Sequence, residues 1–201
     1  MLHPSSELRF IDPEIGYGVF ATKDIPKGTI TWALDAFDQD YSPEEVAAMD
    51  EIHKAITEKY AYRNRFGHYI LCWDFGRYVN HSFRSNCFAT GYDFEIAVRD
   101  IKAGEEITND YGYLNLLTPF KAREENSVRK YVYPDDLMQY HGVWDALVAS
   151  CLPFLFQVPQ PLLQLIPERD LTEIRDTISG KRKMRSILTH YCQEELSPTL
   201  Q

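Results

Sequence analysis

Short apolar runs alternate with turn residues over residues 8 to 34 and predict β-structure. Residues 16–21, which read GYGVFA, are flanked by turn signals. These are the pair Asp12-Pro13 before them and the triplet Pro26-Lys27-Gly28 after them. This pattern predicts two short strands, with Gly28 closing the turn between them. The second strand is expected over about Thr29 to Leu34, a run rich in residues that favour strands.

A helix start follows at Ser42. A serine can cap a helix, Pro43 suits the first helical position, and Glu45 completes a capping box. Apolar and aromatic side chains then recur at helical spacing, namely Val46, Met49, His53, Ile56 and Tyr60. A single helix to about Lys59 is therefore expected.

Strand character returns in three later segments. Residues 69–73 (YILCW) are apolar, residues 94–98 (FEIAV) alternate, and residues 106–108 (EIT) form a last short strand after a turn at Ala103-Gly104. The β-rich part of the chain is expected to end near residue 118.

Beyond Pro119 the pattern becomes helical. Leucine and aromatic side chains recur at helical spacing between Asp136 and Ser150. A capping pattern at Asp170 predicts the start of another helix and Gly180 its end. A further helix is expected over Lys181 to Leu196, so the tail of the chain is predicted to be mostly helical.

Composition narrows the class of protein. The 201 residues are 44% apolar and 25% charged, which indicates an ordinary globular protein and argues against disorder. The net charge is −9, so binding of nucleic acid along the whole surface is disfavoured and basic, lysine-rich partners are compatible.

The cysteines, the first residues and the short length of the apolar runs predict a soluble protein in a reducing, intracellular setting, cytoplasmic or nuclear. The four cysteines show no close pairing and no CxxC motif, so neither a disulfide framework nor a zinc knuckle is indicated. The first residues, MLHPSSELRF, lack the layout of a signal peptide. The longest apolar run, 147–158, is too short to span a membrane and contains Pro153.

Two polar clusters stand out against this background. Residues 77–82 read RYVNHS and residues 109–113 read NDYGY, on either side of a strand-like segment and an acidic turn. Hydroxyls, amides and an imidazole occupy positions where a simple core strand carries Val, Ile and Leu. The crowding predicts either a buried polar network or a binding site.

The order and spacing of these motifs resemble the SET-domain family of S-adenosylmethionine-dependent protein methyltransferases. The resemblance rests on GYG at 16–18, RYVNHS with Asn86-Cys87, AVRDIKAGEEIT at 97–108 and DYGY at 110–113. It covers about residues 8 to 118. A GxG turn alone is weak, because many tight hairpins contain one.

The resemblance implies a fold that is mainly β with α: small curved β-sheets around a pseudoknot, followed by a helical C-terminal extension. The pseudoknot would bring the two polar clusters together. On this interpretation residues 1–118 form the SET domain, with a variable helical insert at about 35–68. Residues 119–201 form a helical region that closes the cofactor pocket.

For S-adenosyl-L-methionine, the resemblance implies a set of cofactor-binding residues around the two motifs. Asn80 and His81 match the Asn-His pair of the family, which contacts the amino-acid end and the adenine of the cofactor. Arg77 is expected either to brace this segment or to contact the cofactor. The implied cofactor-binding set is Gly16, Tyr17, Gly18, Arg77, Asn80, His81 and Phe120.

Tyr111 is the candidate catalytic residue. Methyl transfer to an amine is an in-line displacement that needs the neutral amine, whereas a lysine amine has an ordinary pKa near ~10.4 and is mostly charged at neutral pH. A tyrosine hydroxyl at the inner end of a channel can orient the amine lone pair, and alignment removes a large share of the barrier. Asn109, Tyr69 and Tyr113 are the expected substrate-channel residues.

The chain departs from the family in two places. Asn109 stands where an aromatic residue usually helps to limit the number of methyl groups added, so the number of methyl groups cannot be carried over. The zinc-binding cysteines that often follow DYGY are replaced by Lys121, Arg123 and Val128. No metal is therefore expected there, and Phe120, Tyr131 or Tyr133 is left to cover the adenine.

These motifs predict a protein-lysine N-methyltransferase that uses S-adenosyl-L-methionine, with a basic, lysine-containing protein or peptide as substrate. Neither a direct nucleic-acid nor a membrane partner is expected, and the sequence leaves the oligomeric state open. Two alternatives stay open: a non-catalytic SET-like module that binds a peptide or partner, and a SET methyltransferase that acts on a nucleophile other than lysine.

Overall fold

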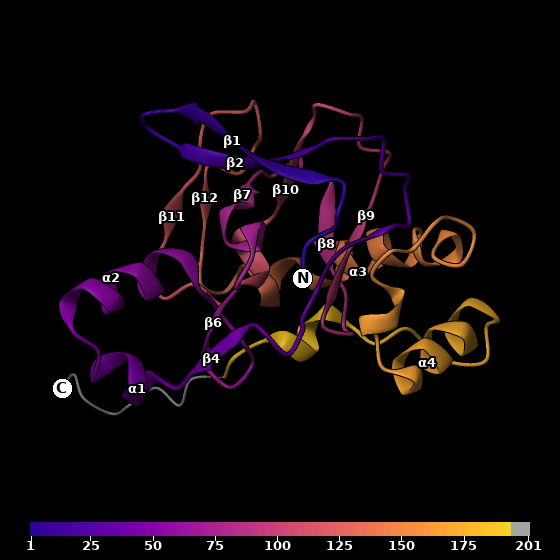
Figure 1. The fold of residues 1–201 in the computed structure, drawn as a ribbon. Coiled ribbons are helices and arrows are strands. Elements are labelled where there is room, and N and C mark those ends of the chain that lie inside the picture. The colour runs from indigo at the N-terminus through magenta and orange to yellow at the C-terminus, as the bar shows by residue number, and fades with distance from the viewer. Residues whose placement is uncertain (194–201) are drawn as a thin grey trace.

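The glycine turn at 16–18 opens a hairpin in a four-stranded sheet of order β1-β2-β10-β7 (Figure 1). The structure is a computed structural model in which residues 1–193 are described. β1 (Ser6–Asp12) pairs antiparallel with β2 (Gly16–Ala21), and β2 pairs antiparallel with β10 (Glu106–Asn109). Gly16 has a φ of 82°, a conformation that favours glycine and begins the return strand.

The fourth strand of this sheet brings the two polar clusters together. β7 (Asn80–His81) lies parallel to β10, with Thr108 opposite Asn80 and Asn109 opposite His81. The predicted strand at residues 106–108 and the predicted approach of the two clusters are both confirmed. The RYVNHS and NDYGY motifs therefore occupy neighbouring strands.

A second sheet, of order β3-β9-β8, lies in the centre of the molecule. It consists of β3 (Ile30–Ala33), β9 (Phe94–Ala97) and β8 (Cys87–Ala89). Its strand β9 confirms the strand expected at residues 94–98 and is buried along all four residues. Phe94 and Ile96 pack in one apolar cluster while Ala97 packs in another, so both faces of the strand are covered.

The insert after β3 carries a small sheet, β4 (Gln39–Tyr41), β6 (Tyr69–Leu71) and β5 (Tyr62–Arg63), together with two helices. The capping box is confirmed, since Ser42 Oγ accepts from the Glu45 amide at 3.2 Å and Glu45 Oε2 accepts from the Ser42 amide at 2.7 Å. The single helix predicted to Lys59 is wrong. It divides into α1 (Pro43–Ala47) and α2 (Glu51–Tyr60), because Asp50 adopts an extended backbone and caps the second helix.

The C-terminal part contains a short hairpin and two helices. The hairpin pairs β11 (Phe120–Lys121) with β12 (Tyr131–Val132), and α3 (Asp136–Ala149) confirms the predicted helix. α4 (Glu168–Ile178) begins before Asp170, whose carboxylate forms an ion pair with Arg185 at 2.9 Å and does not cap.

The helix predicted over Lys181 to Leu196 is wrong within the described residues, and positions 194–196 lie outside them. The chain there forms only the 3₁₀ turn Ile187–His190, because side chains of the body bind its backbone: the Ile187 amide donates to Asp145 Oδ1 at 2.8 Å. Four further 3₁₀ turns occur among residues 1–193, at Phe75–Tyr78, Tyr111–Tyr113, Leu152–Phe154 and Leu163–Leu165.

The main core joins the β-rich part and the tail. Phe88 and Tyr113 of the β-rich part share one buried cluster with Leu137 and Trp144 of α3. Figure 1 shows α3 beside β8, with which it makes contact, and α4 below and to the right of it. Within residues 1–193, no helix combines the length and the apolar character that crossing a membrane requires.

Candidate functional site

Tyr111 lies at the junction of the two polar clusters. Its backbone amide donates to His81 Nδ1 at 3.1 Å, and its hydroxyl donates to the carbonyl of Val79 at 2.9 Å. The turn that carries it is held by Asp110, whose Oδ1 accepts from the Gly112 amide at 2.9 Å. Burial, followed by the negative charges of Glu106 and Glu95, raises the pKa of Tyr111, so the phenol stays protonated.

His81 carries a buried polar atom without a partner. Because its Nδ1 accepts a hydrogen bond, the proton of the neutral ring belongs on Nε2, and Nε2 is buried with no partner among residues 1–193. Only 3% of the side chain is exposed. Burial, followed by the charge of Arg129, lowers the pKa of His81 to about 4. An unsatisfied buried donor costs about 1–3 kcal/mol, so this atom suits a ligand that accepts a hydrogen bond.

The glycine turn packs tightly against Asn80. The Asn80 side chain donates to the carbonyl of Tyr17 at 3.1 Å and to Glu106 Oε1 at 2.8 Å. A Cβ on Gly18 would lie 2.6 Å from Glu106 Oε1 and 2.9 Å from Asn80 Nδ2. A side chain at position 18 would therefore displace the Asn80–Glu106 contact, and Tyr17 remains 49% exposed.

Arg77 makes bracing contacts. Its guanidinium donates to the carbonyl of Trp73 at 2.9 Å and, through Nε, to the carbonyl of Asp74 at 3.3 Å. These bonds close the 3₁₀ turn Phe75–Tyr78 that precedes Asn80. Of the two roles expected for Arg77, the contacts within the protein correspond to the first.

Of the three aromatic residues expected to cover the adenine, Phe120 lies beside the motifs. Its ring centroid is 5.8 Å from that of His81 and 5.5 Å from that of Tyr111, and the residue is 40% exposed. Tyr131 and Tyr133 instead pack against each other, with centroids 6.0 Å apart. Phe120 is therefore placed to contact a ligand at His81.

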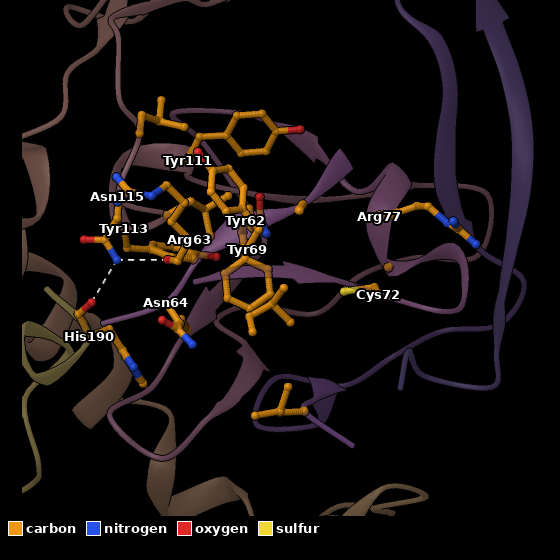
Figure 2. Close-up of a pocket in the computed structure, with 18 of the residues that line it drawn as sticks. Tyr62, Arg63, Asn64, Tyr69, Cys72, Arg77, Tyr111, Tyr113, Asn115 and His190 are labelled. Carbon is orange, nitrogen blue, oxygen red and sulfur yellow. Dashed lines mark hydrogen bonds between the residues drawn. The ribbon is translucent and has the colours of Figure 1, made fainter. Parts of the chain in front are cut away.

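Tyr111 also lines a cavity of about 950 Å³ (Figure 2). Six of the predicted site residues line it: Tyr69, Arg77, Asn109, Tyr111, Tyr113 and Phe120. The glycine turn, Asn80 and His81 are not among its lining residues. The predicted site thus has two sides, which meet at Tyr111 and Phe120.

Glu95 is a site residue that the sequence did not indicate. It lines the cavity, is 8% exposed, and its Oε1 accepts from Asn109 Nδ2 at 2.9 Å and from the Tyr113 hydroxyl at 3.0 Å. Burial raises its pKa. The unusual Asn109 was the one signal in the sequence that could have pointed to a polar partner.

Arg129, also missed, ties the tail to the NDYGY motif. Its guanidinium forms ion pairs with Asp110, at 2.5 Å, and with Asp136 of α3. It also lies over the rings of Phe83, 4.4 Å from the centroid, and Tyr140, at 4.6 Å. Tail and motif are therefore joined by charge and aromatic contacts. Among residues 1–193, no group of three or more His, Cys, Asp or Glu side chains is arranged to hold a metal ion.

The residues on the glycine-turn side suit S-adenosylmethionine, the cofactor that the resemblance implies. The unpartnered His81 Nε2 offers a donor, and Tyr17 and Phe120 offer partly exposed rings to a planar base. Asn80 already has two acceptors in the protein, so its contact with a ligand requires exchange of one of them. The donor and the aromatic surfaces fit this cofactor.

Comparison with known proteins gives one family. Residues 16–112, which include the glycine turn and both polar clusters through Gly112, match the family model of the SET domain. A search of curated proteins finds no match. Among 214 matching chains of solved structures is one from a structure described as apo ctPRC2 with two mutations in Ezh2. That match has 22% identity and a TM-score of 0.40, and it covers 54% of this chain and 15% of the other.

Proposed function

Because this chain is a SET-domain protein, we propose that it transfers a methyl group from S-adenosyl-L-methionine to the side-chain amine of a protein lysine. The observation that carries the proposal is the position of Tyr111 between His81, whose Nε2 has no partner among residues 1–193, and the cavity. One side of this residue suits the cofactor, and the other side has room for a substrate side chain.

The cofactor side is assigned to the glycine turn and the Asn-His pair. His81 Nε2 donates to an acceptor of the cofactor, while the rings of Tyr17 and Phe120 cover its apolar surface. Gly16 and Gly18 set the path of the turn, Asn80 holds the turn to β10, and Arg77 braces the segment before Asn80. When bound, S-adenosylmethionine supplies an activated methyl group on a positively charged sulfur.

Tyr111 orients the amine. Its hydroxyl proton is committed to the Val79 carbonyl, so the oxygen lone pairs can accept an N–H of the incoming amine and aim the nitrogen lone pair. Its pKa is raised by burial, which keeps the phenol neutral at physiological pH. The role proposed for Tyr111 is therefore alignment of the nucleophile; a phenolate acting as general base is disfavoured.

The cavity supplies the substrate channel. Tyr69, Tyr113 and Asn109 line it, and Asn109 is fixed by its bond to Glu95, so it is not free to reorient toward each new ligand. The net charge of −9 supports a basic protein or peptide as the partner. Deprotonation of the ammonium is favoured by the apolar part of the channel, since burial disfavours the charged form of an amine.

The test is incubation of the purified protein with S-adenosylmethionine labelled in the methyl group and a proteome extract, followed by mass spectrometry of the labelled residue. Label on lysine supports the proposal, and calorimetry with the cofactor alone gives an independent readout. The proposal would be overturned if the protein neither incorporated label nor bound the cofactor. Cofactor binding without transfer would favour the non-catalytic module instead, and label on another residue type would change the nucleophile.

A further inference from the structure

One wall of the cavity presents hydrogen-bond acceptors without a partner. Glu95 lines the cavity, and its Oε1 already accepts two hydrogen bonds, from Asn109 and Tyr113. No hydrogen bond from the described residues reaches its other oxygen, Oε2. Asn109 Oδ1 is a second acceptor in the same wall, and it is buried without a partner in residues 1–193. The wall is therefore complementary to a ligand that brings N–H groups.

The wall also carries a negative charge, on Glu95, that no cationic side chain of residues 1–193 pairs with. Glu95 is 8% exposed, yet within the described part of the chain no lysine, arginine or histidine forms an ion pair with it. A buried carboxylate that has neutral donors but no cation is costly, and its raised pKa reflects that cost. A cation that enters the cavity and reaches Oε2 removes it.

The two donors on Oε1 fix where the carboxylate points. Asn109 lies in β10, two residues before Tyr111, and Tyr113 follows Tyr111 in the same 3₁₀ turn. Glu95 is thus held from the strand and the turn that position Tyr111, and its negative charge contributes to the raised pKa of Tyr111. The charged wall and the Tyr111 hydroxyl belong to one channel.

We propose that Glu95 determines substrate specificity, by accepting an N–H of a lysine-type ammonium at Oε2 and so selecting cationic side chains over neutral ones. Asn109 and Tyr113 act as positioning residues for this carboxylate. The inference deepens the proposed lysine methylation and rests on it for the identity of the target side chain. Because the contact stabilises the ammonium, which must lose its proton before it reacts, its benefit falls on substrate binding and not on the transfer step.

The experiment titrates the protein with n-butylammonium, a mimic of the lysine side chain, and with neutral n-butanol, following the amide resonances of the cavity by NMR. The wild type is expected to bind the ammonium at least about tenfold more tightly than the alcohol. Glu95→Gln, which replaces the free acceptor by a donor and keeps the volume, is expected to abolish this preference. Asp93→Asn is the matched control, because Asp93 lines the same cavity but is 41% exposed and pairs with Arg65.

The inference would be overturned if both variants lost the preference for the ammonium equally, or if the wild type showed no such preference. The second result is obtained on the wild type alone and does not depend on the folding of a variant. With a lysine substrate in hand, Glu95→Gln is expected to raise KM at least about tenfold with kcat undiminished, a division that general structural damage would not give. Unchanged kinetics would overturn the role of Glu95 and leave the proposed function standing. Failure of methyl transfer in the wild type would count against the proposed function, while the titration still tests the wall.

Discussion

Arg129 Nη1 lies 2.5 Å from Asp110 Oδ2, and this ion pair connects the C-terminal tail to the motif that carries Tyr111. The other oxygen of the same carboxylate caps the 3₁₀ turn by accepting from Gly112 at 2.9 Å. A guanidinium between two carboxylates and two aromatic rings thus joins the tail to the motif.

Replacing Arg129 by methionine is expected to destabilise the fold by about 3–5 kcal/mol, because the variant leaves two buried carboxylates without their cation. The side chains of Asp110 and Asp136 are 2% and 3% exposed, so water cannot compensate them. Urea unfolding followed by circular dichroism measures the change. The control is Arg175→Met, which breaks an exposed pair with Glu168 and is expected to cost less than about 1 kcal/mol.

If Arg129→Met and Arg175→Met destabilised the protein equally, Arg129 would not be the connection between tail and motif. Arg129→Lys adds a second comparison. It keeps a positive charge but cannot reach both carboxylates with a planar fork, so an intermediate loss is expected.

Gly18→Ala tests the glycine turn. The new methyl group would lie 2.6 Å from Glu106 Oε1 and from Ile11 Cδ1, so Asn80 and Glu106 must move apart, at a cost of about 1–3 kcal/mol. Because Asn80 lies beside His81, the affinity for S-adenosylmethionine is expected to fall at least about tenfold by calorimetry. If Gly18→Ala bound the cofactor as tightly as the wild type, the glycine turn would not be part of the cofactor site.

The control for this substitution is Gly142→Ala in α3. Nothing lies within 4 Å of a Cβ at Gly142, which is an interior helical position. Alanine is the better helix former there, so this variant is expected to gain about 0.5–1 kcal/mol and to bind the cofactor like the wild type.

Tyr111→Phe removes the hydroxyl and keeps the ring between His81 and Phe120. The rate of transfer is expected to fall by about 100-fold or more, because the amine loses its alignment, while the cofactor affinity changes little. Transfer kinetics and calorimetry measure the two quantities separately. Tyr131→Phe, at a 41% exposed position, serves as control and should leave both unchanged. Full activity in Tyr111→Phe would remove Tyr111 from its proposed role.

Local signals predicted the parts of the fold that depend on neighbouring residues. The Ser42–Glu45 capping box and the turn at Gly104, with its φ of 84°, follow from side-chain chemistry a few residues away. Asp170 read as a cap but does not cap, because Arg185 binds it from a distant segment, whereas Asp50, placed inside one predicted helix, caps α2. Contacts made across the chain decide between such equal local options.

In the candidate site too, local motifs predicted some residues, and contacts from distant parts of the chain determined the others. The motifs indicated Asn80, His81 and Tyr111, and the parallel pairing of β7 with β10 places them together. Glu95 and Arg129 were missed because each is polar in a segment whose local pattern fits a solvated residue. Their surroundings come from elsewhere in the chain, since Glu95 bonds to Asn109 and Tyr113 and Arg129 pairs with Asp110 and Asp136, and no pattern within one strand reveals such contacts.

His81 predicts how stability depends on pH. Its pKa is about 4 in the folded protein and near 6.5 when the chain is unfolded, so between these values the unfolded state binds the proton more tightly. The contribution of His81 to stability is therefore complete above about pH 6.5 and is lost as the pH falls toward 4. Between about pH 8 and pH 5 the expected loss is about 2 kcal/mol.

Urea unfolding at the two pH values measures this loss in the wild type and in His81→Phe, which fills the same space without a titrating ring. The variant loses the hydrogen bond to the Tyr111 amide and is expected to be less stable at pH 8, yet to lose less stability on acidification. His3 and His190, whose pKa values are also lowered by burial, keep part of the pH dependence in both proteins. An identical fall in the two proteins would mean that folding does not lower the pKa of His81, and that its ring takes up a proton in the folded protein as readily as in the unfolded chain.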